Sequence, residues 1–376
     1  MITIEDCQSY SAHTGIDLHA QHIYRMKNTR PFSAAITGVG VFVPENKLTN
    51  ADIEKMVDTN DAWIYERSGV RERRILNDPG KGSGYLGFRA VQNLIEKTGI
   101  DPLSIELIIF STATPDHQFP ATANEVAYLA GATRSWSFDL MGACSGFLYA
   151  LQVGRQFIES GAHKRVVVVG ADKMSSVVDY TDRRTCILFG DGGGAVLLEA
   201  DYSGNGMLDA RLYTEGSARE FLYQPAGGSV QPASVETVLQ KQHFIHMSGQ
   251  SVFKVAVQKM ADAAEELMQR NDLSSDDVAF LVPHQANKRI IEATAQRMGI
   301  GMEKVMLNIE RYGNTTCATI PLCLAEWESQ LHAGDKLILT TFGAGFTWGG
   351  IYLRWAYNPK PVATHQAAAP EAEVMG

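Results

Sequence analysis

The chain has 376 residues, of which 45% are hydrophobic and 20% charged, and its formal net charge at pH 7 is −9. This is the composition of a globular protein. The acidic balance argues against nucleic-acid binding, and no apolar run approaches the roughly 18 residues needed to span a bilayer. The five cysteines form no CxxC pair, which favours a reducing compartment over a disulfide framework. Since no secretion signal opens the chain, we expect a cytoplasmic protein.

Regular secondary structure is predicted from Ala34 onward. Residues 1–33 show no clean hydrophobic period and are expected to form a flexible arm. An apolar run that ends at Pro44 predicts the first strand, and Thr49 or Asn50 is expected to cap a short helix. The pattern then predicts, in order, a helix at 83–97, a strand at 107–113, a helix at 121–131, a strand at 136–139, a helix after Cys144 and a strand at 165–170.

The second half of the chain repeats this alternation of predicted strands and helices. Strands that alternate with helices argue for a layered α/β protein. No Pro/Ser-rich linker divides the ordered part, so we expect an internal duplication packed as one body, with halves at 34–205 and 206–358. The tail, 359–376, is rich in alanine, proline and glutamate and is expected to be disordered. The elements predicted in the second half are helix 250–270, strand 278–282, a helix up to Gly299, helix 316–331, and strands 336–341 and 347–355.

Cys144 stands between a predicted strand and a predicted helix, among small residues. Unpaired backbone N–H groups at a helix N-terminus favour negative charge. We therefore expect the pKa of Cys144 to lie below its ordinary value of about 8.5 and the thiolate to act as a nucleophile. The small neighbours are expected to leave room for a bulky acyl group. A buried, inert cysteine is the alternative.

Two polar residues occupy corresponding places in the second half. His284 follows the apolar strand Phe280-Leu281-Val282, and Asn314 lies in a glycine turn before a helix. Taken alone, His284 could be a satisfied core histidine and Asn314 a turn or N-cap residue. With Cys144 they form the set that a thiol enzyme needs: a nucleophile and two donors for a developing oxyanion.

Two charged or glycine-rich stretches have alternative interpretations. The basic cluster at 67–74 is either a solvated face or a phosphate-binding rim with Trp63 as a stacking platform. The glycine run at 190–194 has neither a GKS/T ending nor the strand–GxGxxG–helix context of a phosphate-binding loop. We therefore predict that these glycines serve close backbone packing.

Four motifs follow one another along the chain: Ala143-Cys144-Ser145-Gly146-Phe147, Val282-Pro283-His284-Gln285-Ala286-Asn287, Gly313-Asn314-Thr315, and the closing Phe342-Gly343-Ala344-Gly345-Phe346-Thr347-Trp348-Gly349. From about Ala34 to Trp355 the sequence resembles the β-ketoacyl-acyl-carrier-protein synthase III family, the thiolase-fold enzymes that initiate bacterial fatty-acid synthesis. The resemblance implies a five-layered αβαβα fold built from two duplicated halves, and a homodimer. It also implies a catalytic triad of Cys144, His284 and Asn314.

The reaction that the resemblance implies is a decarboxylative Claisen condensation, the first elongation step of fatty-acid biosynthesis. Cys144 takes the acyl group of a short acyl-CoA, with the backbone N–H groups of Cys144 and Ala344 as oxyanion donors. Malonyl-acyl-carrier protein then loses CO2, and neutral His284 Nε2–H and Asn314 Nδ2–H donate to the enolate oxygen. The products are 3-oxoacyl-acyl-carrier protein, CoA and CO2. Acyl-CoA is a substrate, and no metal or cofactor is implied.

The resemblance also implies substrate contacts. Trp63 stacks on the CoA adenine with Arg183 on its other face, while Arg67 and Lys254 approach the CoA phosphates, for which cationic side chains are suited.

Two further sites involve protein partners. Lys288, Arg289 and Arg297 would form a docking face for the acidic carrier protein, although solvated surface charge is the alternative. Phe119 matches a position that reaches into the acyl pocket of the partner subunit.

Other functional classes fit these motifs less well. A thiolase is disfavoured because the closing glycine loop, 342–346, contains no cysteine. A specialised relative that uses a longer acyl starter for a secondary metabolite stays open, because pocket shape is not readable from these motifs. A non-catalytic carrier-docking subunit is disfavoured because all three triad residues are present.

Overall fold

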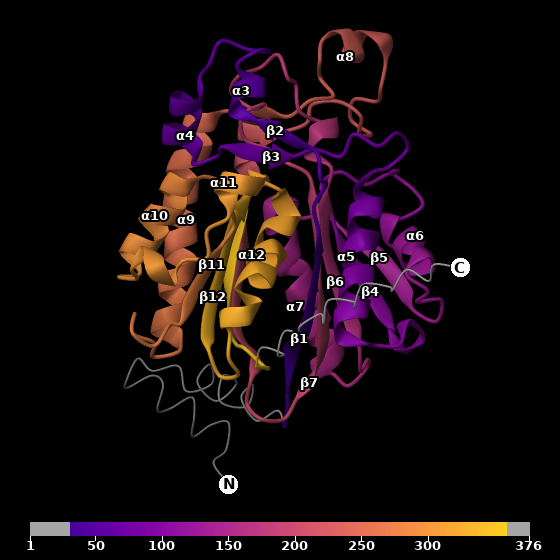
Figure 1. The fold of residues 1–376 in the computed structure, drawn as a ribbon, viewed down its shortest axis with the longest axis vertical. Helices are drawn as coiled ribbons and strands as arrows, with labels where there is room; N and C mark the ends of the chain where they lie inside the picture. The colour runs from indigo at the N-terminus through magenta and orange to yellow at the C-terminus, as the bar shows by residue number, and fades with distance from the viewer. Residues whose placement is uncertain (1–30, 359–376) are drawn as a thin grey trace, which may run out of the picture.

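The computed structural model describes residues 31–358 and contains two large sheets with helices between and outside them (Figure 1). The five-stranded sheet runs in the order β1 (Ser33–Phe42), β7 (Gly192–Asp201), β6 (Val166–Asp172), β4 (Leu107–Ser111) and β5 (Trp136–Leu140). The four-stranded sheet runs in the order β11 (Phe280–Pro283), β12 (Lys336–Gly343), β13 (Thr347–Arg354) and β8 (Gly206–Thr214).

Three layers of helices complete the fold. The outer face of the five-stranded sheet is covered by α5 (Ser83–Thr98) and α6 (Thr122–Leu129). Between the two sheets lie α7 (Gly146–Glu159) and α12 (Thr319–Trp327). The outer face of the four-stranded sheet carries α9 (Gly249–Arg270), against which α10 (Lys288–Arg297) packs. This is the five-layered αβαβα arrangement predicted from the sequence.

The two halves repeat one order of elements. In the first half β1, α5, β4, α6, β5, α7, β6 and β7 follow one another, and in the second half β8, α9, β11, α10, α12, β12 and β13 do so. The counterpart of β5 is reduced to an isolated parallel bridge between Leu281 and Val305. Because the strand orders also correspond, Cys144 and Asn314 follow equivalent parts of the two halves and lie at the same end of the middle layer.

Local sequence explains these elements. Strands β4 and β6 are buried along their whole length, as expected of central parallel strands with continuous apolar sequence. Thr49 caps α3 (Asn50–Ile53) and forms a capping box with Asp52, which confirms the predicted cap. Phe147, Leu148 and Leu151 of α7 belong to a core cluster that includes strands of both sheets. The helix that follows Cys144 is therefore enclosed from both sides.

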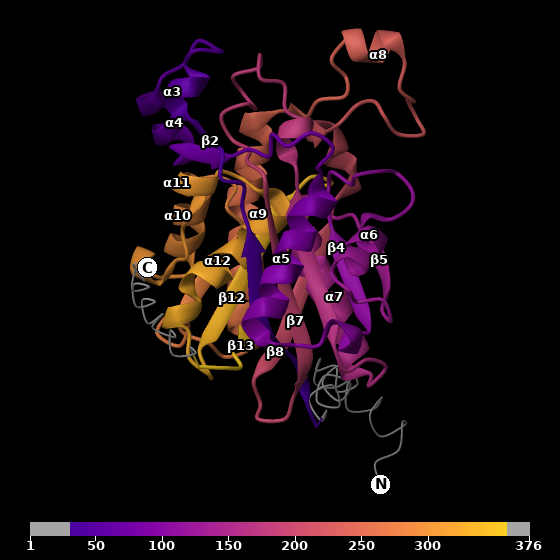
Figure 2. The same cartoon turned by 45° about the vertical axis from the view of Figure 1, so that its right-hand side comes forward.

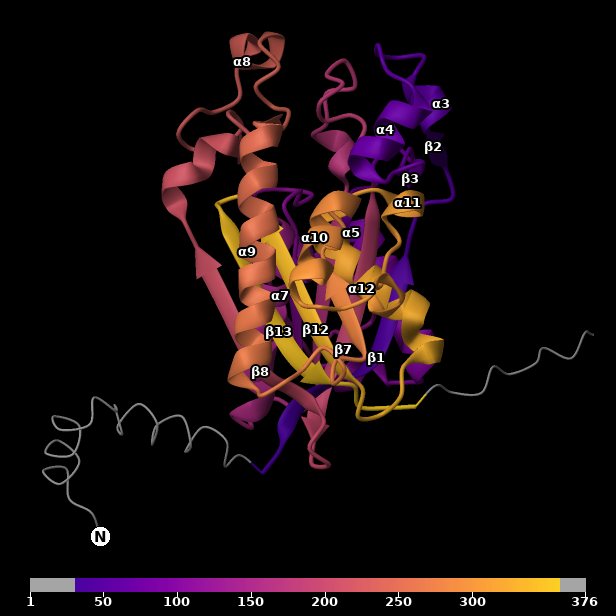
Figure 3. The same ribbon diagram turned by 90° about the vertical axis from the view of Figure 1, so that its left-hand side faces the viewer.

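Some elements were not predicted. Helix α4 (Asp61–Ser68) begins where Asn60 accepts a hydrogen bond from Trp63 N and ends at Gly69, whose φ is 81°. The connection at 215–248 contains the short α8 (Val235–Leu239) and projects beyond the layers (Figures 2 and 3). This connection also holds η4 (Gly216–Phe221) and the paired strands β9 (Leu222–Tyr223) and β10 (His246–Met247). The remaining small sheet pairs β2 (Lys47–Thr49) with β3 (Glu72–Arg74).

The predicted flexible arm lies outside the described residues up to residue 30, and the predicted disordered tail lies outside them from residue 359. Phe32 already packs on Tyr202, with ring centroids 5.2 Å apart. Within residues 31–358, no helix is both long and apolar enough to cross a membrane.

Candidate active site

Cys144 lies in a 3-10 turn, η2 (Ala143–Ser145), that leads directly into α7. Ala143 before it has a φ of 46°, in the left-handed region. The carbonyl oxygen of Cys144 itself accepts a hydrogen bond of 3.0 Å from the Thr341 hydroxyl of β12. The turn is thus held from the second half of the chain, and the predicted position at a helix start is confirmed.

The protonation of Cys144 differs from the prediction. Burial, with a smaller contribution from the nearby Asp172 carboxylate, raises the pKa of Cys144 to about 12. The expected lowering of this pKa is therefore wrong for the ligand-free protein. Desolvation of a thiolate outweighs the favourable helix terminus because the second half of the chain covers the thiol. The resting group is a neutral thiol.

The two glycines next to Cys144 are closely packed. A Cβ atom added at Gly142 would come within 2.8 Å of Gly146 Cα, and one added at Gly146 would collide with Ser111 Oγ on β4. For these two residues the expectation that small neighbours leave room for an acyl group is wrong, because their open sides face the protein. The run at 190–194 behaves as predicted: a Cβ at Gly190 would come within 2.3 Å of Tyr312 O, and one at Gly193 within 2.5 Å of Leu86 O.

His284 follows β11 directly, and its backbone nitrogen donates to Thr340 O of β12 at 2.8 Å. The side chain is 1% exposed. Ring nitrogen Nδ1 lies 2.8 Å from Thr319 Oγ1, whereas Nε2 is buried and has no hydrogen-bond partner. Burial lowers the pKa of His284 to about 3, so the imidazole is neutral at physiological pH. An unpartnered buried ring nitrogen is the kind of group that a substrate atom satisfies.

Asn314 lies in the turn that joins α11 (Ile309–Tyr312) to η6 (Thr316–Ala318). Its backbone nitrogen donates to Leu188 O at 2.8 Å, and its side-chain Oδ1 accepts from Thr316 N at 2.9 Å. Because Oδ1 is engaged by the turn, Nδ2 is the end of the amide that is left to donate to a ligand. The orientation of the side chain therefore suits the predicted donor role.

Short routes of hydrogen bonds connect the three residues. Thr341 and Thr340 are neighbours on β12, and they bind the backbone of Cys144 and of His284 respectively. From the His284 ring, Thr319 Oγ1 leads at 3.0 Å to the Thr316 carbonyl, and Thr316 N binds Asn314.

Asp172 lies beneath this arrangement and was not predicted. Its carboxylate is fully buried at the end of β6. It accepts hydrogen bonds from Thr112, Ala113 and Thr114 of the first half, and from Thr316 Oγ1 and Cys317 N of the second half. It therefore fixes the Asn314 turn against the first half. An acid directly after a buried strand was the signal in the sequence.

The closing glycine loop meets Cys144. A Cβ atom added at Gly343 would come within 2.8 Å of the Cys144 backbone nitrogen. Thr347 Oγ1 lies 3.3 Å from Gly142 O and 3.0 Å from Ala344 O, the two acceptors between which its single proton is shared. Ala344, predicted as an oxyanion donor, therefore belongs to a loop held against the turn of the nucleophile.

Three of the four predicted CoA contacts gather on one surface. The guanidinium of Arg67 lies 4.6 Å, and that of Arg183 5.7 Å, from the Trp63 ring centroid. Arg183 also donates to Asp58 O at 3.0 Å. Lys254 is exposed on α9, and no contact joins it to this group.

The rest of the basic cluster at 67–74 is engaged within the protein. Arg73 is fully buried and donates to three acceptors: Leu48 O, Asn50 Oδ1 and Ile187 O. Burial lowers its pKa to about 10. Arg71 pairs with acids at 2.9 and 3.0 Å. Of the two interpretations of the cluster, a fully solvated face is excluded, and Arg67 is the member that lies beside Trp63.

The predicted docking residues lie on α10 but differ in availability. Lys288 and Arg289 each lie over an aromatic ring. Arg297 pairs with Asp262, at 2.7 Å, and with Glu265. Lys288 Nζ also lies near an acid, Glu292, but at 3.8 Å. Because the ion pairs of Arg297 are shorter, Lys288 and Arg289 are the stronger candidates.

Phe119 is 85% exposed, in the loop before α6. An aromatic side chain this exposed has little packing role within the chain, so the predicted contact of Phe119 with a second copy stays a prediction.

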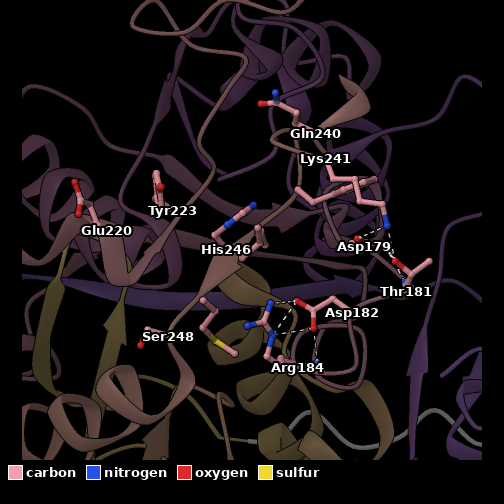
Figure 4. A pocket seen from close by; sticks show the side chains of 13 residues that line it. Asp179, Thr181, Asp182, Arg184, Glu220, Tyr223, Gln240, Lys241, His246 and Ser248 are labelled. Carbon is pink, nitrogen blue, oxygen red and sulfur yellow. Dashed lines mark hydrogen bonds and ion pairs between the residues drawn. The ribbon is translucent and has the colours of Figure 1, made fainter. Parts of the chain in front are cut away.

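A cavity of about 710 Å³ lies between residues 179–184 and 240–248 (Figure 4). Arg184 is held by Asp182 at 2.8 Å, and Lys241 by Asp179 at 2.9 Å. Both cationic side chains that line the cavity are thus paired, and none of the predicted site residues lines it. Within residues 31–358, no three His, Cys, Asp or Glu side chains are grouped closely enough to hold a metal ion.

Comparison with known proteins agrees with the fold and the motifs. Residues 138–216 match the family model of 3-oxoacyl-[acyl-carrier-protein] synthase III, and residues 268–355 match the model of its C-terminal part. The β-ketoacyl-[acyl-carrier-protein] synthase III of Chlorobaculum tepidum is 56% identical over 326 residues, which cover 86% of this chain and 99% of that protein. The Porphyromonas gingivalis (strain W83) protein of the same name is 53% identical over 330 residues, 88% of this chain and 98% of that protein.

A solved structure agrees as well. The crystal structure of 3-oxoacyl-[acyl-carrier-protein] synthase III from Aquifex aeolicus VF5 has a TM-score of 0.79 and 40% identity, and the match covers 86% of this chain and 100% of that chain. The predicted fold and the predicted class, a condensing acyltransferase, are confirmed. The chain belongs to the 3-oxoacyl-[acyl-carrier-protein] synthase III family.

Proposed function

We propose that this chain condenses a short acyl-CoA starter with malonyl-acyl-carrier protein through an acyl-Cys144 intermediate, as the first elongation step of fatty-acid biosynthesis. The observation that carries the proposal is the hydrogen-bonded arrangement that holds Cys144, His284 and Asn314 at one end of the middle layer, with His284 Nε2 buried and unpartnered. A site that leaves a polar atom unsatisfied is prepared for an oxygen of the substrate.

The first half-reaction is acyl transfer from CoA to Cys144. The Cys144 sulfur bonds to the thioester carbonyl carbon, the bond from that carbon to the CoA sulfur breaks, and the thiol proton leaves with CoA as its thiol. Because the resting thiol is neutral, proton loss has to accompany the attack. The backbone N–H groups of Cys144 and Ala344 stabilise the tetrahedral oxyanion, as the contact between their two segments supports.

The second half-reaction is decarboxylative condensation. Malonyl-acyl-carrier protein loses CO2, and the electron pair of the broken C–C bond forms an enolate whose oxygen accepts hydrogen bonds from His284 Nε2–H and Asn314 Nδ2–H. The enolate carbon attacks the acyl carbonyl, and Cys144 leaves as a thiolate that takes up a proton. Neutral His284 suits a donor that is not consumed, and no step needs a metal or a cofactor.

Substrates reach the site from the surface that carries Trp63. The CoA adenine stacks on Trp63 beside Arg183, and Arg67 and Lys254 bind the phosphates. The position of two guanidinium groups near one indole supports this. The carrier protein, which is acidic, docks on Lys288 and Arg289 of α10, with Arg297 as a weaker contributor because of its ion pairs.

The active protein is proposed to be a homodimer in the cytoplasm. Strand β5 is an edge strand with Trp136 47% exposed, and exposed Tyr128, Met141 and Phe119 belong to neighbouring segments. Unpaired edges and exposed aromatic side chains favour pairing with a second copy, into which Phe119 would reach. The described cysteines are all free, which suits a reducing compartment.

A condensation assay tests the proposal. The full-length protein is incubated with malonyl-acyl-carrier protein and a panel of acyl-CoAs, from acetyl through branched C4–C5 to C8 and longer, and the carrier protein is weighed by mass spectrometry. A 3-oxoacyl product from acetyl or branched short chains is expected. Product from long chains only would move the function to a specialised relative. Absence of product from every starter would refute a condensing function.

A further inference from the structure

We propose that Thr319 is a positioning residue that holds neutral His284 in the tautomer with its proton on Nε2. This inference rests on the proposed function, because it concerns the hydrogen that His284 Nε2 donates to the enolate oxygen. Thr319 is the first residue of α12 and is 2% exposed, and His284 is 1% exposed. The two side chains meet in a buried environment, where the Thr319 hydroxyl determines which nitrogen of the His284 ring carries the proton.

The geometry gives the hydroxyl two acceptors. Thr319 Oγ1 lies 2.8 Å from His284 Nδ1 and 3.0 Å from the carbonyl oxygen of Thr316. A hydroxyl has a single proton and accepts through its lone pairs. It therefore either donates to Nδ1 or donates to the carbonyl and accepts from Nδ1–H.

The two choices produce opposite active sites. When Thr319 donates to Nδ1, the ring proton resides on Nε2. Nε2 has no partner within the protein and can then donate its hydrogen to a substrate atom. When Thr319 donates to Thr316 O, the proton resides on Nδ1 and Nε2 presents a lone pair that repels an enolate oxygen. Both contacts have ordinary hydrogen-bond lengths. Thr316 O already accepts the backbone N–H of Thr319, and decarboxylation needs the donor form of Nε2, so we assign the proton of Thr319 to Nδ1.

Thr316 connects this choice to the rest of the site. Its φ is 47°, and its hydroxyl binds Asp172 while its backbone nitrogen binds Asn314 Oδ1. The carbonyl that competes for the Thr319 proton is thus fixed in place by the residues that also orient Asn314. The His284 ring and the Asn314 side chain are thus both held by one short segment, through Thr319 Oγ1 and Thr316 N respectively.

The tautomer is measured directly by solid-state ¹⁵N NMR on the full-length protein labelled at the histidine ring nitrogens. The His284 signals are identified by their absence in His284→Ala. A protonated Nε2 and an unprotonated Nδ1 are expected. The reverse pattern would overturn the inference, and if that protein still formed 3-oxoacyl product the proposed function would stand without it.

Two variants of Thr319 test the functional consequence. Thr319→Val, which keeps the shape and removes the hydroxyl, should lower kcat of condensation by at least about tenfold, the usual lower bound for loss of a partner that orients a histidine. Its rate of Cys144 acylation by the same acyl-CoA should stay within about twofold, since that step does not use the His284 donor. Thr319→Ser should restore condensation because the hydroxyl returns.

The matched control is Thr294→Val on α10, which removes a buried threonine hydroxyl that donates to Ile290 O and has no contact with the site. It should condense at the wild-type rate. Two results would overturn the inference: normal condensation by Thr319→Val, or a loss in Thr319→Ser as large as that in Thr319→Val, which would indicate packing alone. The NMR measurement on the unmutated protein decides the question if Thr319→Val does not fold.

Discussion

Gly343 at the end of β12 lies directly against Cys144, so that a Cβ atom on Gly343 would come within 2.8 Å of the Cys144 backbone nitrogen. The two residues are separated by about half of the chain and come from different halves of the fold. Their contact places the closing loop, with the Ala344 N–H, beside the N–H of the nucleophile. The oxyanion site thus depends on how closely the two halves approach each other.

Replacing Gly343 by alanine should separate these segments. The added methyl group has to displace backbone atoms of Cys144 and Ser145, which are not flexible side-chain ends. We expect acylation of Cys144 to slow by about 10²-fold, the usual effect of losing one oxyanion donor, and Tm to fall. Stopped-flow acylation and a thermal melt measure both. Gly228→Ala, where a Cβ would meet nothing within 4 Å, is the control and should match the wild type. Wild-type acylation by Gly343→Ala would contradict the assigned oxyanion site.

Removing either donor should separate the two half-reactions. His284→Ala and Asn314→Ala should acylate at Cys144 within a few-fold of wild type but lose roughly 10²–10³-fold in condensation, because each removes a hydrogen bond to the enolate. Acylation is followed by intact-protein mass and condensation by the mass of the carrier protein. If His284→Ala condensed at the normal rate, the mechanism would be wrong.

The reactivity of Cys144 toward an alkylating agent tests its protonation. A pKa raised to about 12 by burial leaves the group as a thiol at neutral pH, and its reactivity should increase as the pH rises toward that value. Iodoacetamide should therefore modify Cys144 more slowly at pH 7 than it modifies free glutathione, as followed by peptide mass spectrometry. Rapid modification at pH 6, which marks a stabilised thiolate, would show that the helix terminus outweighs burial.

Burial of neutral His284 should make folding stability depend on pH. Its folded pKa of about 3 lies below the unfolded value of 6.5, so between these values the unfolded chain binds a proton that the folded chain does not. Stability is thus fully present above pH 6.5 and falls as the pH decreases, by about 2 kcal/mol from this one group between pH 6.5 and 5. Urea unfolding of wild type and His284→Ala at equal protein concentration measures the difference. Parallel pH profiles would contradict a buried neutral ring.

Much of the fold could be predicted because its signals are local. The apolar run of β6 and the Thr49 cap are read within a few residues, and the observed elements start and end close to the predicted ones. The burial of a charged residue, in contrast, depends on residues that are distant in the sequence. Arg73 is part of a basic run, yet it is buried because acceptors at Leu48, Asn50 and Ile187 surround it, which no window of sequence contains.

The sequence motifs predict which residues of the site react, and this stays a prediction, but they do not indicate the residues that hold them in place. Asp172 and Thr319 act through partners that are 35 to 145 positions away in the chain, so the sequence does not indicate which residues they bind. The predicted direction of the Cys144 pKa was wrong for the same reason. The helix terminus is visible in the sequence, whereas the burial that outweighs it is supplied by Thr341 and Gly343 of the other half.

The most direct test of the central claim is the intact mass of the wild-type protein and of Cys144→Ala after incubation with acetyl-CoA and with branched C4–C5 acyl-CoAs. We expect a single acyl adduct on the wild type, mapped to the peptide that contains Cys144, and none on Cys144→Ala. An adduct that persists in Cys144→Ala, or no adduct on the wild type from any acyl-CoA, would contradict the claim that Cys144 carries the acyl group.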